Sequence, residues 1–119
     1  MKFTESHEWI DLQNGLATVG VTEYAQKELG DIVYVELPKV GKQVKKGDPA
    51  AVLESTKAAA DVYSPVSGTI AEVNTDLIEK SELVNLSPEK LGWLFKLSSI
   101  NDDEFESLLD ATAYKENII

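Results

Sequence analysis

Short apolar runs separated by turn residues dominate this sequence and limit the folds that it can adopt. The runs are four to seven residues long and rich in Val, Ile and Tyr, and they occupy residues 7–12, 16–21, 31–37, 50–55, 60–63, 69–73 and 93–97. Several of them alternate; in 31–37 we expect the even-numbered side chains on one face of a strand and the odd-numbered ones on the other. Turn residues such as Asn14-Gly15 and Ser67-Gly68 separate the runs. The pattern predicts a mainly β chain folded as a small barrel or sandwich.

A short helix is expected in the N-terminal half, at residues 23–29. Thr22 can cap this helix, the acidic Glu23 lies in its first turn, and Gly30 can end it. These residues interrupt the series of strand-like runs, so the helix should lie between two strands.

A second helix is expected near the C-terminal end, at residues 103–114, capped by Asn101 or Asp102. Its apolar side chains recur at helical spacing, which favours packing on the outside of the β core. A helix that binds a partner would show the same pattern. The segment 74–92 is polar and weakly patterned, and we expect it to be a long irregular connection.

Composition excludes several classes of partner. The chain has 119 residues and a formal net charge of −10, which fits one domain, 1–119. Nucleic acid and anionic membranes repel such a protein, so neither is an expected partner. No apolar run approaches the about 20 residues that a membrane-spanning helix needs, and residues 1–9 lack the apolar core of a signal peptide. We therefore expect a cytoplasmic monomer.

The sequence offers few groups for catalysis. It has no cysteine, and all eleven basic residues are lysines, so thiol nucleophiles, zinc–thiolate sites and bidentate arginine contacts are excluded. His7 is the single histidine, and no nucleophile-elbow or phosphate-binding motif is present. We expect neither an enzyme nor a resident metal.

One lysine stands out in the stretch 54–68, which reads ESTKAAADVYSPVSG. A strand-like run ends at Ser55 and another begins at Ala60, so Lys57 is expected near the tip of a β-hairpin. Catalytic Schiff-base lysines are usually buried, whereas an exposed lysine between small residues suits attachment of a group. Acylation of the ε-amine would remove its charge and add a long flexible arm, with the chemistry supplied by a cofactor.

The residues around Lys57 resemble a known family. ESTKAAADVYSPVSGTIAEVN, from Glu54 onward, resembles the lipoyl-attachment segment of glycine cleavage system H-proteins. The similarity extends to SHEW at 6–9, ATVGVTEYAQKELGDIVYVELP at 17–38, VGKQVKKGD at 40–48 and LLDATAY at 108–114. Biotin carriers have Met-Lys-Met at the modified lysine, and lipoyl domains of 2-oxoacid dehydrogenases usually have Asp-Lys-Ala and lack the SHEW segment. The chain therefore resembles the H-protein family.

The resemblance implies a lipoyl/biotinyl-like fold, a flattened barrel-sandwich hybrid. It implies that lipoate is attached to Lys57 as an amide and that this swinging arm serves glycine catabolism and one-carbon metabolism. The arm would receive an aminomethyl group from glycine on the P-protein (glycine decarboxylase). The T-protein (aminomethyltransferase) would pass the one-carbon unit to tetrahydrofolate, and the L-protein (dihydrolipoyl dehydrogenase) would reoxidise the arm. The chain itself would be a non-catalytic carrier, with a lipoylating enzyme as its further partner.

Four other residues are site candidates by the same resemblance. Glu54 matches the acidic residue that helps the lipoylating enzyme recognise its target, and this interpretation is favoured over a solubilising charge at a strand end. Ser6, Glu8 and Asp61 match polar groups that line a cleft for the loaded arm, where a carboxylate would suit a charged amine. Ordinary exposed polar residues would explain these three equally well.

Several residues have a structural interpretation instead. Gly68 is expected to be a turn glycine, His7 to pack or to form a hydrogen bond, and Trp9 and Trp93 to lie in the core. SPEKLGW at 87–93 replaces the Pro-Tyr-Gly-x-Gly-Trp that is usual in the family, so the local loop is expected to differ.

The sequence leaves two alternatives to the glycine cleavage role. One is an H-like protein that relays lipoyl groups to other lipoate-dependent enzymes. The other is a non-lipoylated module that keeps the fold for protein binding.

Overall fold

The computed structural model describes residues 1–118. In this part of the chain the strands are β1 (Lys2–Phe3), β2 (Glu8–Gln13), β3 (Leu16–Val21), β4 (Ile32–Glu36), β5 (Gln43–Val44), β6 (Pro49–Ser55), β7 (Ala59–Tyr63), β8 (Gly68–Val73) and β9 (Phe95–Ser98). The helices are α1 (Glu23–Leu29), α2 (Asp76–Glu79), α3 (Leu83–Leu86), α4 (Asp102–Glu106) and α5 (Ala111–Asn117). The seven apolar runs correspond to seven of these strands; β1 and β5, of two residues each, were not predicted.

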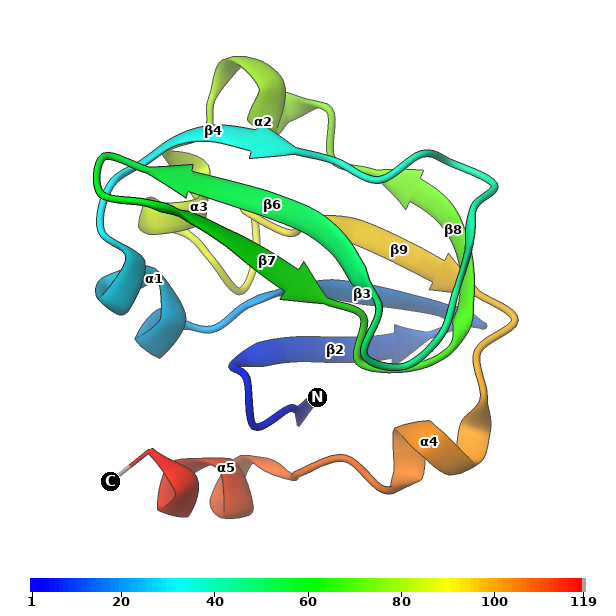
Figure 1. The fold of residues 1–119 in the computed structure, drawn as a ribbon. Coiled ribbons are helices and arrows are strands. Elements are labelled where there is room, and N and C mark those ends of the chain that lie inside the picture. Colours follow the sequence, from blue (N-terminus) through cyan, green and yellow to red (C-terminus); the bar gives the residue numbers. More distant parts are fainter. Residues whose placement is uncertain (119) are drawn as a thin grey trace.

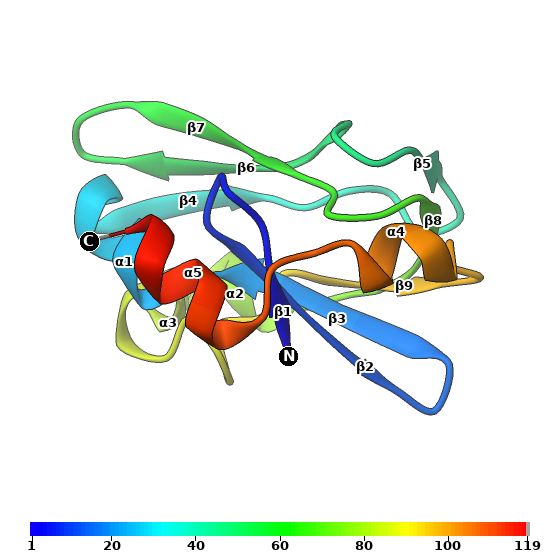
Figure 2. The same ribbon diagram turned by 90° about the horizontal axis from the view of Figure 1, so that it is seen from below.

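The strands form two antiparallel sheets. One has six strands in the order β1-β2-β3-β9-β8-β5, and the other has three in the order β4-β6-β7. The sheets lie as two layers with the helices around their ends (Figure 1 and Figure 2). This arrangement confirms the predicted mainly β sandwich with an N-terminal-half helix and helical structure at the C-terminal end.

The core is made by side chains from both sheets. Val19, Phe95 and Leu97 of the six-stranded sheet and Leu53 and Val62 of the three-stranded sheet belong to one buried cluster. Each such side chain contributes about 1.5–3 kcal/mol when it is removed from water. The core therefore fixes the three-stranded sheet, which carries the lysine hairpin, on the larger sheet.

The alternation predicted for 31–37 is wrong in β4. Ile32 and Val35 are buried, whereas the neighbouring Val33 and Tyr34 are exposed. The register of β4 against β6 shifts between Ile32 and Tyr34. A bulge of this kind adds a residue to one strand, so the side chains that follow change face.

The single C-terminal helix predicted at 103–114 is also wrong, because the chain forms α4 and α5 with a break between them. At the break, the backbone of Leu109 pairs with that of Phe3, with N···O distances of 2.8 and 3.0 Å. Asp110 then caps α5 by accepting a hydrogen bond from the Ala113 amide at 2.8 Å. A residue that pairs with a strand cannot continue a helix, so the pairing with β1 ends the first helix.

The segment 74–92 contains two short helices, α2 and α3, rather than irregular structure alone. Leu77 and Val84 are the buried residues of these helices, and the partly buried Leu83 of α3 also packs on the core. Leu77 lies four positions after the run 69–73 and Val84 lies nine before the run 93–97, and the two gave no periodic signal in the sequence.

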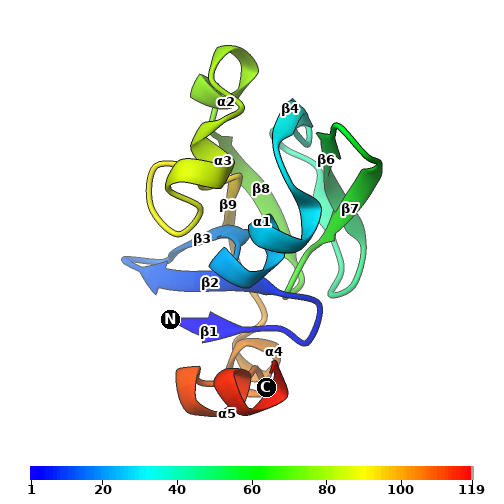
Figure 3. The same ribbon diagram turned by 90° about the vertical axis from the view of Figure 1, so that its left-hand side faces the viewer.

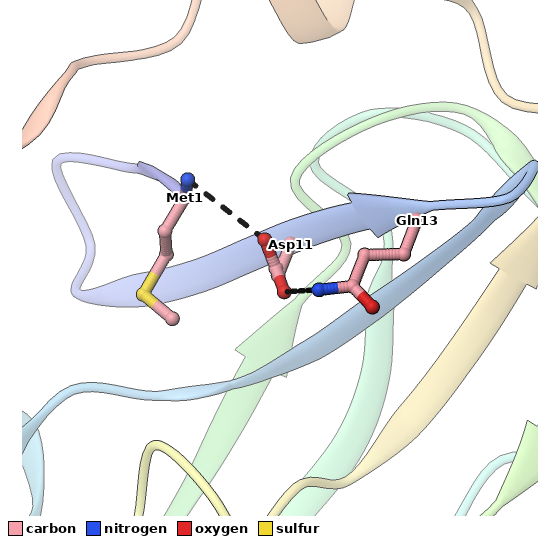
Figure 4. A network of polar contacts seen from close by, with 3 residues as sticks. All are labelled: Met1, Asp11 and Gln13. Carbon is pink, nitrogen blue, oxygen red and sulfur yellow. Dashed lines mark hydrogen bonds and ion pairs between the residues drawn. The ribbon is translucent and has the colours of Figure 1, made fainter.

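Polar contacts hold the start of the chain on the six-stranded sheet. The α-ammonium group of Met1 lies 3.8 Å from an Asp11 carboxylate oxygen, and the Gln13 amide donates a hydrogen bond to the other oxygen at 3.2 Å (Figure 4). These groups are partly exposed, so the ion pair contributes at most about 1 kcal/mol. Among the described residues, no helix has the length and apolar character needed to cross a membrane.

Candidate functional site

The β6–β7 hairpin carries Lys57 in a tight, hydrogen-bonded turn. The Ser55 hydroxyl oxygen accepts hydrogen bonds from the amides of Lys57 and Ala58 at 3.1 and 3.2 Å, and the Ser55 amide donates to the Ala58 carbonyl at 2.8 Å. Side-chain oxygens of Ser often satisfy turn amides in this way. The hairpin predicted around Lys57 is confirmed, and the lysine itself is exposed.

The tip of the hairpin rests on the corner between α1 and β4. The Thr56 amide donates a hydrogen bond to the Asp31 carbonyl at 3.3 Å. The Lys57 side chain passes close to Gly30, since its Cε atom would lie 3.9 Å from a Cβ added there. Gly30 ends α1 with φ = +81°, a conformation that favours glycine. Figure 3 shows α1 beside the end of the β6–β7 hairpin.

A cavity of about 160 Å³ opens between α1 and β7, and we call it the α1–β7 cleft. Its walls are the loop 6–8, Val21, the α1 residues Ala25, Glu28 and Leu29, and residues 60–62 of β7. Ligand pockets usually have about 300–1,000 Å³, so this cleft suits the end of an arm better than a whole ligand.

The structure brings together three of the four additional site candidates. Ser6, Glu8 and Asp61 all line the α1–β7 cleft, although they come from two distant segments of the chain. Glu54 lies outside it, on an exposed position of β6 opposite Ala59.

Glu8 differs from an ordinary surface carboxylate because it is 2 % exposed. Its carboxylate accepts hydrogen bonds from the Thr4 and Ser6 hydroxyls at 2.5 and 2.6 Å and from the Tyr63 amide at 3.3 Å. Burial raises the pKa of Glu8, while these hydrogen bonds lower it in part. The cleft therefore contains one buried carboxylate whose position is fixed by three donors.

His7 forms part of the same wall and is held from the C-terminal helix. Its Nδ1 atom and the Tyr114 hydroxyl share a hydrogen bond of 2.9 Å, and its ring lies 4.6 Å from that of Tyr24. His7 has φ = +73°, which is uncommon for a residue with a side chain. The expected hydrogen-bonding role of His7 is confirmed, but its partner on α5 had no signal in the sequence.

Sequence reasoning also missed Asn85, which lies in α3. Its side chain donates hydrogen bonds to the Gly30 carbonyl and to Gln26, and it accepts one from the Ile32 amide. All three partners belong to the helix–strand corner that supports the hairpin tip.

The interpretation of Gly68 as a turn residue is wrong. Gly68 begins β8, and a Cβ there would lie 2.9 Å from the Ser98 carbonyl oxygen. Close approach of β8 and β9, and not a turn conformation, therefore requires glycine. Trp9 is in the core as expected, at 3 % exposure, whereas Trp93 is half-buried beneath the Lys96 ammonium group.

Among the larger cavities in the described part of the chain are two of about 580 and 590 Å³. The first is bordered by residues 3–6, Lys46 and 107–109, and the second by loops at the β5 edge. Neither borders Lys57. Within residues 1–118 no group of three or more His, Cys, Asp or Glu side chains is placed to hold a metal ion.

The family model described as "Glycine cleavage H-protein" matches residues 1–119. The chain belongs to the glycine cleavage H-protein family. The family predicted from the sequence, and with it the role of lipoyl carrier in the glycine cleavage system, is thereby confirmed.

Individual relatives agree with the family match. A glycine cleavage system H protein of Thermotoga maritima is 54% identical over 115 residues, which are 97% of this chain and 93% of the relative. One from Escherichia coli is 53% identical over 116 residues, 97% of this chain and 90% of the relative. The crystal structure of a glycine cleavage system H protein from Mycobacterium marinum has a TM-score of 0.87 and 35% identity, and the match covers 99% of this chain and 96% of that one. This likeness agrees with the predicted barrel-sandwich fold.

Proposed function

We propose that Lys57 carries lipoate in amide linkage and that the chain shuttles an aminomethyl group from the P-protein to the T-protein. The observation that carries this proposal is the place of Lys57: its exposed side chain stands on a hydrogen-bonded tip next to the α1–β7 cleft. An exposed ε-amine with small neighbours is open to an acylating enzyme, and the adjoining cleft can receive the end of the arm. The residues present therefore fit the group.

Attached to Lys57, the lipoyl group would supply the disulfide chemistry needed to carry the one-carbon unit. The residues of the cleft hold the end of the arm and shield it from water. The carboxylates of Glu8 and Asp61 favour a cationic amine in the cleft, and the apolar side chains of Val21, Leu29 and Val62 limit the access of water. No side chain of the cleft needs to take part in a bond-forming step, so we propose a carrier without catalytic activity of its own.

Glu54 is proposed as a recognition residue for the lipoylating enzyme. It is exposed and lies three residues before Lys57, on the strand that leads into the tip. A charge at this place is available to a basic surface of an enzyme that closes over Lys57, and it does not border the cleft. Its role is therefore expected in attachment of the arm and not in docking of the arm.

We further propose that residues 1–119 act as one domain, that the protein is monomeric and cytoplasmic, and that its partners are the P-, T- and L-proteins and a lipoylating enzyme. The formal net charge of −10 supports basic partner surfaces and argues against nucleic acid.

Intact mass after incubation with lipoate, ATP and a lipoate ligase tests the attachment. We expect one added lipoyl group in the natural chain and none in Lys57→Arg, which keeps the charge. Lys46→Arg, at another exposed lysine, is the matched control and should be modified normally. An unmodified natural chain would exclude every carrier role and leave a protein-binding module. Glycine–bicarbonate exchange with a P-protein then separates the shuttle from a lipoyl relay, because a relay gives no exchange.

A further inference from the structure

Helix α1 forms one wall of the cleft but has little packing of its own. It has seven residues and none of them is buried. Isolated helices of this length are unstable in water, so contacts from outside must hold α1 in place. At its C-terminal end Leu29 packs on the core, and the side-chain hydrogen bonds from outside the helix come from Asn85.

The Asn85 side-chain amide makes three hydrogen bonds at this end. Its Nδ2 group donates to the Gly30 carbonyl at 2.8 Å and to Gln26 Oε1 at 3.0 Å. Its Oδ1 atom accepts a hydrogen bond from the Ile32 amide at 2.8 Å. Both amide protons and the carbonyl oxygen are thus used, and the end of α1 is tied to the start of β4.

The bond to Ile32 also reaches the lysine hairpin through a rigid unit. The Ile32 N–H and the Asp31 carbonyl belong to one planar peptide group. One end of this group is held by Asn85, and the other end, the Asp31 oxygen, accepts the hydrogen bond of the Thr56 amide. The orientation that Asn85 gives to the Asp31–Ile32 peptide therefore determines where Thr56, and with it Lys57, can be held.

We propose that Asn85 is a positioning residue that keeps the Lys57 hairpin and the α1 wall in one fixed arrangement, so that an arm on Lys57 docks in the α1–β7 cleft. Only the docking of the arm rests on the proposed function. The hydrogen bonds that connect Asn85 to Thr56 through the Asp31–Ile32 peptide exist in the unmodified chain. Asn85 touches neither Lys57 nor the cleft, and acts through Gly30 and the Asp31–Ile32 peptide.

Amide hydrogen exchange on the unmodified protein tests the link directly. In Asn85→Ala we expect exchange of the Thr56 and Gly30 amides to rise at least about tenfold beyond any change in the most protected core amides. Asn74→Ala is the matched control, because Asn74 also donates two side-chain hydrogen bonds, to the Leu91 and Trp93 carbonyls at 2.9 and 2.8 Å. It should lower global stability to a similar extent and leave the Thr56 amide unchanged relative to the core.

Asn85→Asp separates the hydrogen bond that Asn85 accepts from Ile32 from those that it donates to the end of α1. The carboxylate can still accept the Ile32 hydrogen bond but cannot donate to Gly30. We expect the Thr56 amide to keep its protection while the Gly30 amide, which donates to the Gln26 carbonyl at the helix end, exchanges faster. If Asn85→Ala does not fold, Asn85→Asp provides the test. An unchanged exchange rate of the Gly30 amide in Asn85→Asp would overturn the proposal.

Docking of the arm is read from methyl NMR shifts of Val21, Leu29 and Val62 on lipoylation. These shifts should be at least halved in Asn85→Ala and unchanged in Asn74→Ala, while both variants are still lipoylated at the exposed Lys57. Equal effects of the two substitutions on Thr56 exchange would show a purely structural role for Asn85 and refute the inference. A natural chain that takes up no lipoyl group would instead refute the proposed function. The hydrogen-exchange experiment would still test the positioning role of Asn85, because it uses the unmodified protein.

Discussion

The hydroxyl oxygen of Tyr114 lies 2.6 Å from Thr22 Oγ1, although 92 positions separate these residues in the sequence. Thr22 caps α1 by accepting a hydrogen bond from the Ala25 amide at 3.2 Å, and both Thr22 and Tyr114 are buried. The C-terminal helix α5 therefore holds the first turn of α1 as Asn85 holds the last. A helix without buried residues is fixed at both ends by side chains from distant parts of the chain.

Replacing Tyr114 by Phe should lower the free energy of unfolding by about 1–3 kcal/mol, because the hydroxyl bonds to Thr22 and His7 are lost. The aromatic ring and its stacking on Phe3, at 4.7 Å between centroids, are kept. Urea unfolding measures the loss. Tyr24→Phe is the control, since the Tyr24 ring contacts His7 and its hydroxyl makes no side-chain hydrogen bond within residues 1–118. An equal loss in both variants would show that the Tyr114 hydroxyl has no special part.

Glu8 should make the stability of the protein depend on pH. Burial raises its pKa above the ordinary 4.5 in the folded state, so the folded protein binds this proton more tightly than the unfolded chain does. The corresponding stabilisation is fully present below pH 4.5 and is lost as the pH rises through the raised pKa.

The isosteric Glu8→Gln variant lacks this titration. We therefore expect the natural chain to lose stability relative to Glu8→Gln as the pH rises from about 4 to about 8 in urea-unfolding series. Glu54→Gln, at an exposed strand position, is the control for removal of a carboxylate from the surface. A constant gap between the natural chain and Glu8→Gln would contradict the raised pKa.

Two glycines should differ in the cost of adding a methyl group. A Cβ at Gly92 would stand 2.5 Å from the Leu83 carbonyl oxygen, whereas one at Gly41 meets nothing within 4 Å. Gly92→Ala is expected to lower the free energy of unfolding by about 3 kcal/mol or more through overpacking against backbone. Gly41→Ala should cost only about 1–2 kcal/mol, from its left-handed conformation at φ = +93°. Thermal or urea unfolding ranks the two, and the reverse order would be inconsistent with the close packing of α3 on Gly92.

If the P-protein is a partner, as proposed, its association with this chain should slow as salt is added. The formal net charge of −10 produces a long-range attraction to a basic partner surface. At about 0.1 M salt the screening length is about 10 Å, so this attraction acts only near contact. Stopped-flow association rates between about 0.01 and 0.3 M salt measure the effect. Rates that do not change with ionic strength would show that the acidic surface does not steer the encounter.

The parts of the structure that depend on neighbouring residues were predictable. The alternating runs predicted most strands, and Thr22 and Gly30 marked the limits of α1, because each signal lies within a few residues of its consequence. The Lys57 hairpin was predictable for the same reason, because the runs that form its two strands lie directly on either side of Lys57. Ser6, Glu8 and Asp61 were reached through the family resemblance, since no local pattern places the first residues of the chain beside β7.

The missed features all depend on contacts between distant residues. Glu8 is buried although carboxylates are normally exposed; its donors Thr4 and Ser6 are sequence neighbours, but the third donor, the Tyr63 amide, comes from 55 positions away. Asn85 and Tyr114 meet their partners across 53 and 92 positions, and their own neighbours carry no sign of it. The break between α4 and α5 arises because Leu109 pairs with Phe3, which helix periodicity cannot reveal.

The pairing of Phe3 with Leu109 also has a consequence for the order of folding. It joins residues from almost opposite ends of the sequence, and contacts of such separation close late because the intervening chain must first be ordered. Until Leu109 and Tyr114 have been synthesised and docked, the first turn of α1 and His7 lack their support. During synthesis on the ribosome, residues 55–59 of the lysine hairpin therefore emerge well before Leu109 and Tyr114, the residues that support the wall beside it.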